Sequence, residues 1–465
     1  MSVYNMLQSP LDSFYNLDKI VDENSKNYSM YKSIVRANCK DKIYGKYNEN
    51  ESNQFYLRLY YDWYNNLLSC ANRKGVKQEY KEILDKLINY LNNKVPSTKE
   101  DVIDILSEDK DDEELNEILN IFRWNNLGED TGWNHIASSK VKFGTHKAPS
   151  PCHRIYINCD STITHKLARL FVEKCNDEDL TYYFKFDDFG KRDDNFVIYS
   201  DSENLEKYVM ILKRVIKEEH LASNIHRPPI CTSTIDDQLG YGSDPEIGGD
   251  VESFNQNRSD HLEKCFNNTF YKWIENRGKE HLINTLIHSA KDEIKNYIGS
   301  SSTYKGFRGY TKEDLDTEEF YDAVNEYMHD HIDNIMDYYK TGNDDFKRTI
   351  PFVDGYLKID KDILNMARKK EIKYIYSENE DFRYNLKNEI LSTCEENGID
   401  KNNYGCNLYL LEDLKKETMS NIVSLDVNVR NIDDKKYHSN RRSIFGFLFG
   451  KKKKEEEEED QVVNY

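Results

Sequence analysis

The sequence predicts an α+β protein in which helical regions flank a small central sheet. Apolar residues recur at helical spacing before residue 143 and again after residue 260, whereas three short stretches between residues 154 and 199 are strand-like. Helical patterns follow the first and the third of these stretches, which gives the order β-α-β-β-α. We therefore predict a helical module over residues 1–143, an α/β core over residues 150–265 with its helices on one face of the sheet, a mostly helical region over residues 266–440, and a disordered charged tail over residues 441–465.

The helical module is predicted from apolar side chains that recur about once per helical turn. Phe55, Leu59 and Trp63 show this spacing, and the pattern returns between residues 83 and 91. The stretch Gly144–Pro151, which is rich in Gly, Pro and Ser, then marks a boundary. The module itself shows no motif that indicates a chemical activity.

The core is predicted from three strands and two helices. Arg154–Cys159, Tyr182–Phe186 and Phe196–Tyr199 are short, rich in β-branched and aromatic residues, and therefore typical of strands. Residues 160–162 (Asp-Ser-Thr) offer N-caps for a helix directly after the first strand. Apolar residues from Leu205 to Ile216 trace one face of a second helix.

The rest of the chain combines a predicted loop, further helices and a charged end. Ile225–Asn257 is predicted to be a long loop because Pro, Gly and Asp punctuate it, and such a loop inside a domain usually serves a site. Helical spacing returns from His261, and Ile422–Val429 is weakly strand-like. At the end, Lys451–Lys454 is followed by Glu455–Glu459, a pattern of charge blocks that cannot bury apolar surface.

Composition and charge exclude several classes of partner. The net charge is −19 at pH 7, so a general nucleic-acid surface is not expected, because phosphate backbones are bound through an excess of Lys and Arg. We expect no transmembrane segment, since no stretch reaches the ~20 apolar residues that cross a bilayer. The first residues lack a secretory signal, and nine dispersed cysteines without a CxxC motif indicate reduced thiols in the cytoplasm.

Strand alternation predicts which side chains share a face of the sheet. In the first strand Arg154, Tyr156 and Asn158 point to one side, and in the second strand Tyr183 and Lys185 do the same. If helices cover the apolar side, these five polar side chains lie together on an open surface.

Cationic side chains gather on this predicted surface, although the chain is strongly acidic. Arg192, just before the third strand, adds to Arg154 and Lys185. One interpretation is that they simply solvate the exposed face of a half-buried sheet. The other is an anion site, in which Arg forks bind phosphate and a partly desolvated Lys acts as a base.

Five segments, taken in order, carry a resemblance to a known family. The chain resembles the HopA-type type III effector family, which includes the lyase component of class V lanthipeptide and thioamitide-type synthetases, and it distantly resembles the phosphothreonine lyase effectors. The resemblance covers about residues 150–265. The segments that carry it are His153–Asn158 (HRIYIN), Tyr183–Asp187 (YFKFD), Lys191–Tyr199 (KRDDNFVIY), Tyr241–Pro245 (YGSDP) and Ser253–Arg258 (SFNQNR).

The resemblance implies a role for each of five residues in a β-elimination that needs no metal and no cofactor. Lys185 falls on the lysine that takes the α-proton, and Arg192 falls on a phosphate clamp. Arg154 and Tyr156 fall on a lysine and a general-acid histidine, and Arg258 would be a further phosphate ligand. At Tyr156 a phenol replaces an imidazole, and with an unperturbed pKa of ~10 it is the poorer acid near neutral pH.

The chemistry of such a site is self-consistent. Removal of an α-proton needs a neutral lysine, and the arginines around Lys185 would lower its pKa by repulsion between like charges. Phosphate leaves more readily when arginine forks neutralise its charge.

Two other patterns indicate chemistry only weakly. His329 and Asp333 have a metal-ligand spacing on a helix. They lie away from its apolar side, so the better interpretation is that they belong to its solvent-exposed face. Gly240–Gly249 contains four glycines, yet neither a preceding strand nor a GK[ST] motif makes it a phosphate loop.

Three hypotheses about function follow. The first is a lyase that eliminates phosphate from phosphorylated Ser or Thr in a protein or peptide, with the helical module positioning a partner. The second is a binding module that recognises phosphorylated or acidic segments without turnover. The third is a helical scaffold.

Overall fold

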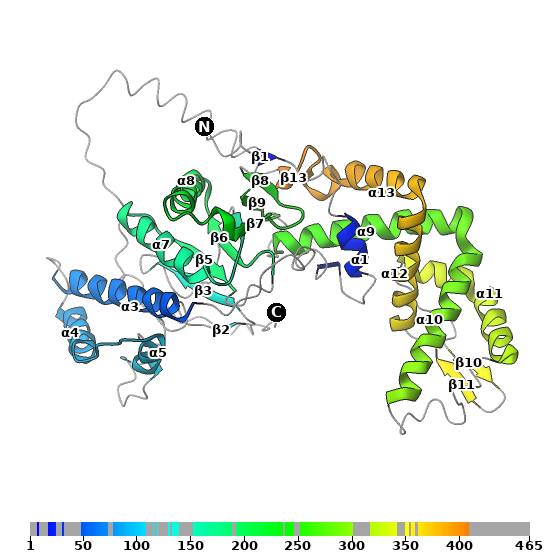
Figure 1. The fold of residues 1–465 in the computed structure, drawn as a ribbon, viewed down its shortest axis with the longest axis horizontal. Coiled ribbons are helices and arrows are strands. Elements are labelled where there is room, and N and C mark those ends of the chain that lie inside the picture. Colours follow the sequence, from blue (N-terminus) through cyan, green and yellow to red (C-terminus); the bar gives the residue numbers. More distant parts are fainter. Residues whose placement is uncertain are drawn as a thin grey trace, which may run out of the picture. The chain divides into compact units, whose positions relative to one another are not determined.

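Two compact units make up the part of the chain that the computed structural model describes (Figure 1). The first unit consists of Met1–Pro10, Asn38–Val251 and Asn403–Tyr465, and the second of Leu11–Ala37 and Glu252–Asn402. The structure describes residues 7–8, 17–24, 30–31, 48–72, 78–107, 115, 119, 129–130, 133–138, 152–187, 192–235, 238–245, 252–300, 317–341, 349–352, 355–358 and 361–408.

An antiparallel sheet is the centre of the first unit. Its strands follow one another in the order β1-β8-β9-β4-β6-β5-β3-β2, and β7 pairs with β4 beside β9. Their bounds are β1 Leu7–Gln8, β2 Glu129–Asp130, β3 Trp133–Ala137, β4 His153–Cys159, β5 Tyr183–Phe186, β6 Phe196–Ser200, β7 Ile225–His226, β8 Ser233–Ile235 and β9 Leu239–Ser243.

Two helices cover one face of this sheet, as the alternation of the strands predicts. The apolar side chains of α7 (Thr164–Asp177) and α8 (Ser202–Glu218) belong to one core together with those of β4, β5 and β6. Phe184 and Phe196 stack in this core with ring centroids 5.2 Å apart. The predicted order β-α-β-β-α and the α+β class are therefore confirmed.

Three described helices of the first unit lie between β1 and β2 in the chain. They are α3 (Glu49–Ala71), α4 (Gln78–Asn92) and α5 (Lys99–Ser107), and the first two lie where the helical spacing predicts them. Helix α3 packs on α7. An ion pair also joins the two helices, because the guanidinium of Arg169 on α7 lies 3.2 Å from the carboxylate of Glu51 on α3. The helical N-terminal part thus extends the core of the sheet.

Two parts of the sheet differ from the sequence prediction. Residues 225–257 are not one loop, because they contain β7, β8, β9 and the start of a helix. Glycines are typical of loops, but at Gly240 of β9 a Cβ would lie 2.8 Å from the Thr232 hydroxyl, so glycine permits close packing there. Strand β3 also joins the sheet from within residues 1–143, which the sequence assigns to a helical module.

The second unit is mostly helical, as predicted for the C-terminal region. Residues 274–278 form a π-helical turn that joins α9 to α10. The helices and strands of this unit are α1 Leu17–Asn24, α9 Phe254–Trp273, α10 Lys279–Ser300, α11 Glu318–Thr341, β10 Thr349–Phe352, β11 Gly355–Lys358, α12 Lys361–Glu378, α13 Glu380–Thr393 and β12 Ile399–Asp400. Strand β13 (Asn403–Asn407) belongs to the first unit.

Three sequence predictions fall outside the described residues. They are the boundary at Gly144–Pro151, the strand-like stretch Ile422–Val429 and the charged tail 441–465. Among the helices that the structure describes, none combines the length and the apolar character needed to cross a bilayer.

A buried histidine lies where α3, α7 and the sheet meet. His165 on α7 is 1% exposed, and its ring lies 5.2 Å from that of Phe186 and 6.0 Å from that of Phe55. Burial, together with the nearby charge of Lys99, lowers the pKa of His165 to about 3. The imidazole is therefore neutral in the folded protein at every pH near neutrality.

We predict that His165 makes the protein less stable in mild acid. Between pH 6.5 and pH 3 the unfolded chain binds a proton that the folded chain does not, so the free energy of unfolding falls as the pH is lowered. At pH 4.5 the loss from this one group is about 2–3 kcal/mol. Urea unfolding at pH 7 and pH 4.5 should show that His165→Leu removes this part of the pH dependence.

A control substitution is available at exposed His220, where the backbone has φ 56° and Asn is well tolerated. His220→Asn should keep the full pH dependence. Equal pH dependence in wild type and His165→Leu would contradict the prediction.

Candidate functional site

The face of the sheet opposite α7 and α8 carries most of the side chains that the sequence singled out; we call it the open face because neither of these helices covers it. The sequence predicted an open surface here, but Arg154, Tyr156 and Asn158 are each less than 9% exposed in the structure. Across the strands Tyr156 pairs with Val197, Val197 with Lys185, and Lys185 with His135. Cross-strand partners leave the sheet on the same side, so these side chains form one row. Arg154, Tyr199 and Tyr183 form a second, parallel row on the same face.

Lys185 and Arg192 share one aromatic side chain, Trp133 on β3. The Lys185 ammonium lies 4.4 Å from the centroid of the Trp133 ring, and the Arg192 guanidinium lies 4.7 Å from it. Because both distances end at the same centroid, the two cations can be no more than about 9 Å apart. Lys185 is half-buried, and the Trp133 ring is 7% exposed.

Arg154 is held by a carboxylate from the end of β9. Its Nη2 donates to Asp244 at 2.7 Å, and its Nε lies 2.6 Å from the other oxygen of the same carboxylate. Both side chains are about nine-tenths buried. The Arg154 guanidinium also lies 4.9 Å from the Tyr199 ring centroid, and the Lys185 ammonium lies 5.9 Å from that centroid.

Arg192 has a carboxylate partner of its own. Its Nε donates to Asp194 at 2.8 Å and its Nη2 at 3.2 Å, while the Arg192 side chain stays 24% exposed. Each arginine of the open face is thus paired with an aspartate. The repulsion that the sequence led us to expect around Lys185 is therefore largely offset.

Tyr156 lies in the row of Lys185 and is 1% exposed. Burial raises the pKa of Tyr156 well above its ordinary value, although the charge of Arg154 opposes the shift. The phenol is therefore protonated throughout the physiological range. It can donate a hydrogen bond, but it is a weak source of protons.

Arg258 belongs to the second unit. It lies in α9, is fully buried, sits 4.8 Å from the Phe254 ring centroid and donates a hydrogen bond to Asn257. Its role as a phosphate ligand stays a prediction.

Two residues of this face were missed in the sequence because β3 was missed. Trp133 and His135 alternate with the inward-facing Asn134 and Ile136, and this alternation in WNHIA was the available signal. Asp244 belongs to the segment YGSDP, but local sequence does not indicate that its carboxylate pairs with Arg154. Only the pairing of β9 with β4 brings it to Arg154.

Comparison with known proteins gives one family. Residues 136–284 match the HopA1 effector protein family. The predicted resemblance to HopA-type effectors is therefore confirmed over this segment, which contains every strand from β4 to β9.

One solved structure is also similar, that of an effector protein from Pseudomonas syringae pv. tomato strain DC3000. The two chains are 13% identical, the alignment covers 54% of this chain and 86% of the other, and the TM-score is 0.28. No curated protein matches the chain.

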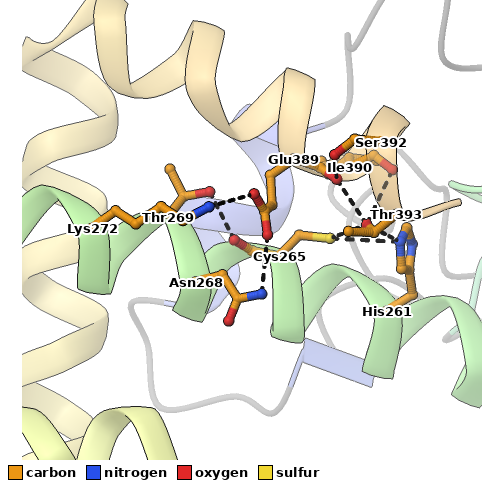
Figure 2. A network of polar contacts seen from close by, with 9 residues as sticks. All are labelled: His261, Cys265, Asn268, Thr269, Lys272, Glu389, Ile390, Ser392 and Thr393. Carbon is orange, nitrogen blue, oxygen red and sulfur yellow. Dashed lines mark hydrogen bonds and ion pairs between the residues drawn. The ribbon is translucent and has the colours of Figure 1, made fainter. Parts of the chain in front are cut away.

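A cluster of polar side chains lies between α9 and α13 in the second unit (Figure 2). His261 lies 2.9 Å from the Thr393 hydroxyl and 3.6 Å from the Cys265 sulfur. A catalytic Cys–His pair needs a thiolate beside an imidazolium. Burial acts the other way on both groups, because it raises the pKa of Cys265 to about 11 and lowers that of His261 to about 4. The cluster is a neutral polar contact between two helices.

His329 and Asp333, which have a metal-ligand spacing in the sequence, each lie near a charged side chain of α10, and His329 Nε2 is 3.8 Å from the Glu280 carboxylate. The Asp333 carboxylate is 83% exposed and lies 2.6 Å from the Lys279 ammonium. Within the described ranges, no three His, Cys, Asp or Glu side chains converge as metal ligands would.

We predict that Arg154 and Asp244 stabilise the fold as a pair. Arg154→Met leaves the Asp244 carboxylate buried without its partner and should cost about 3–5 kcal/mol, whereas the double variant Arg154→Met/Asp244→Leu should regain most of this loss. Urea unfolding measures both. Arg58→Met is the matched control, since the Arg58–Asp62 pair is more exposed and should contribute less than about 1 kcal/mol. A single-variant loss no larger than that of the control would contradict the assignment.

We also predict that Cys265 is inert in the folded protein. At pH 8 a thiol with a pKa of about 11 is almost entirely protonated, and the side chain is 1% exposed. Iodoacetamide labelling followed by peptide mass spectrometry should modify Cys265 only after denaturation. Rapid labelling of the native protein would show a reactive thiol.

Proposed function

We propose that the open face binds the phosphate of a phosphorylated Ser or Thr in a protein or peptide and eliminates it, with Lys185 as the base. The observation that carries the proposal is the joint position of Lys185 and Arg192 on Trp133. A base and a phosphate ligand must lie a few ångströms apart to act on one side chain, because phosphate and α-proton are separated by only three bonds.

Arg192 is the better placed of the two phosphate ligands in this unit. Asp194 accepts from Nε and Nη2 of Arg192, and the Arg192 side chain is 24% exposed. Arg154 is 8% exposed and is held by Asp244. Arg154 would therefore contribute charge and anchor the face, and Arg192 would contact the phosphate directly.

The reaction balances without a co-reactant. Neutral Lys185 takes the α-proton, the electron pair of that bond forms the Cα=Cβ double bond, and the Cβ–O bond breaks as phosphate leaves. Tyr156, protonated at all relevant pH values, would donate a hydrogen bond to the charge that develops. Arg192 neutralises the leaving group.

A non-catalytic phosphate-binding module is the second candidate. The observation in its favour is that both arginines of the open face are already paired with aspartates, which weakens their field at Lys185. Such a module would recognise phosphorylated or acidic segments of a partner and release them unchanged.

The match to an effector family suggests the setting of either activity. We propose an effector-like protein that acts on a protein target in the cytoplasm, with the helices α3–α5 positioning that target. No nucleic acid, metal or cofactor is part of this proposal.

A phosphothreonine peptide tests the proposal. We expect the full-length protein to release inorganic phosphate and to leave a dehydrated residue that mass spectrometry detects as loss of phosphoric acid. Lys185→Met should abolish turnover but leave binding within a few-fold, whereas Arg192→Met should weaken binding by at least about tenfold. Lys166→Met is the control, because Lys166 lies on α7 and pairs with Glu219 away from the open face.

The outcomes separate the two candidates. Binding without release of phosphate would support the module and exclude the lyase. Neither binding nor release would exclude both.

A further inference from the structure

Strand β3 brings a histidine to the open face directly beside Lys185. His135 is the cross-strand partner of Lys185 in the antiparallel pair of β3 and β5. In such a pair the Cβ atoms are about 4.5–5.5 Å apart, and both side chains leave the sheet on the same side. His135 is half-buried, and its place on β3 directs its side chain to the open face.

Tyr183 determines which imidazole nitrogen faces a ligand. The Tyr183 hydroxyl lies 3.4 Å from Nδ1 of His135, and the two rings lie nearly parallel with centroids 6.4 Å apart. Nδ1 is the nitrogen that faces this hydroxyl, and we assign Nε2 to the bound anion. Burial raises the pKa of Tyr183, so the phenol stays neutral and can serve either imidazole charge state.

We propose that His135 is a further catalytic residue of the open face and gives a proton to the departing phosphate. The inference rests on the elimination proposed above. The proton on Nε2 passes to the oxygen of the breaking Cβ–O bond, so that a phosphate dianion substrate leaves as hydrogen phosphate. Lys185 gains one proton and His135 loses one, and the total charge is unchanged.

Tyr156 is less suited to this step. It lies in the same row, but burial keeps its proton in place. An imidazole changes its charge near its unperturbed pKa of ~6.5, which matches proton transfer at neutral pH. The described charged and titratable groups that face His135 are Lys185 and Tyr183 on β5. Arg192 lies near Trp133, which is on the same strand as His135.

Another histidine of the sheet provides a matched control. His226 on β7 pairs with Asn158, and its Nε2 lies 2.6 Å from Asp160. Three strand spacings separate β7 from β5, about 14 Å, so His226 is too far from Lys185 to serve the same bond.

Turnover of a phosphothreonine peptide by wild type, His135→Gln and His226→Gln, measured from pH 5.5 to 9, tests the proposal. We expect His135→Gln to lower kcat by about 10²–10⁴-fold with KM changed by less than about threefold. Wild type needs protonated His135, so its kcat/KM should fall as the pH rises above the imidazole pKa, and this alkaline fall should vanish in His135→Gln. His226→Gln should match wild type in both respects.

Tyr183→Phe supplies a second variant should His135→Gln fold poorly. It keeps the imidazole and removes its hydroxyl neighbour, so we expect the alkaline limb to persist at a shifted pH. Active wild type with an unchanged rate and pH profile in His135→Gln would overturn the role of His135 and leave the lyase intact. No release of phosphate by wild type would instead overturn the lyase itself.

Discussion

The alternation of side chains along β4, β5 and β6 is the constraint on which the proposed site depends. One set, which includes the stacked rings of Phe184 and Phe196, is buried under α7 and α8. Burying that set commits the other set, with Arg154, Tyr156 and Lys185, to the opposite face. A register shift of one residue would exchange the two sets and would place charged side chains in the core. The same strand register therefore determines both which side chains form the core and which side chains lie on the open face.

Charge compensation shapes this face as much as position does. The protein is acidic overall, and each arginine beside Lys185 has an aspartate partner within hydrogen-bonding distance. Such pairing offsets part of the desolvation cost of a buried guanidinium when no ligand is bound. In the proposed function, a phosphate would therefore add to existing ion pairs and would not fill an empty cationic pocket. Moderate affinity, and easy release of phosphate as a product, would follow from this arrangement.

The sequence predicted the parts of the fold that local patterns determine. Strands β4, β5 and β6 and helices α7 and α8 have strong periodicity, and alternation correctly placed Arg154, Tyr156 and Lys185 on one face. It did not predict β9, because its glycines are typical of loops, whereas in the structure Gly240 permits close packing against Thr232. Strand β3 was missed because it follows a long helical stretch, and with it Trp133 and His135. Contacts such as Arg154–Asp244 join residues 90 positions apart and depend on strand order, which local patterns do not contain.

The fate of the oxygen between phosphorus and the threonine side chain tests the central claim most directly. Elimination breaks the Cβ–O bond, so the phosphate released in heavy-oxygen water should carry no oxygen from the solvent, and the peptide should contain a double bond that accepts an added thiol. Hydrolysis breaks the P–O bond and would place one solvent oxygen in the phosphate while restoring threonine. Labelled phosphate, or a peptide returned with its phosphate intact, would contradict the account.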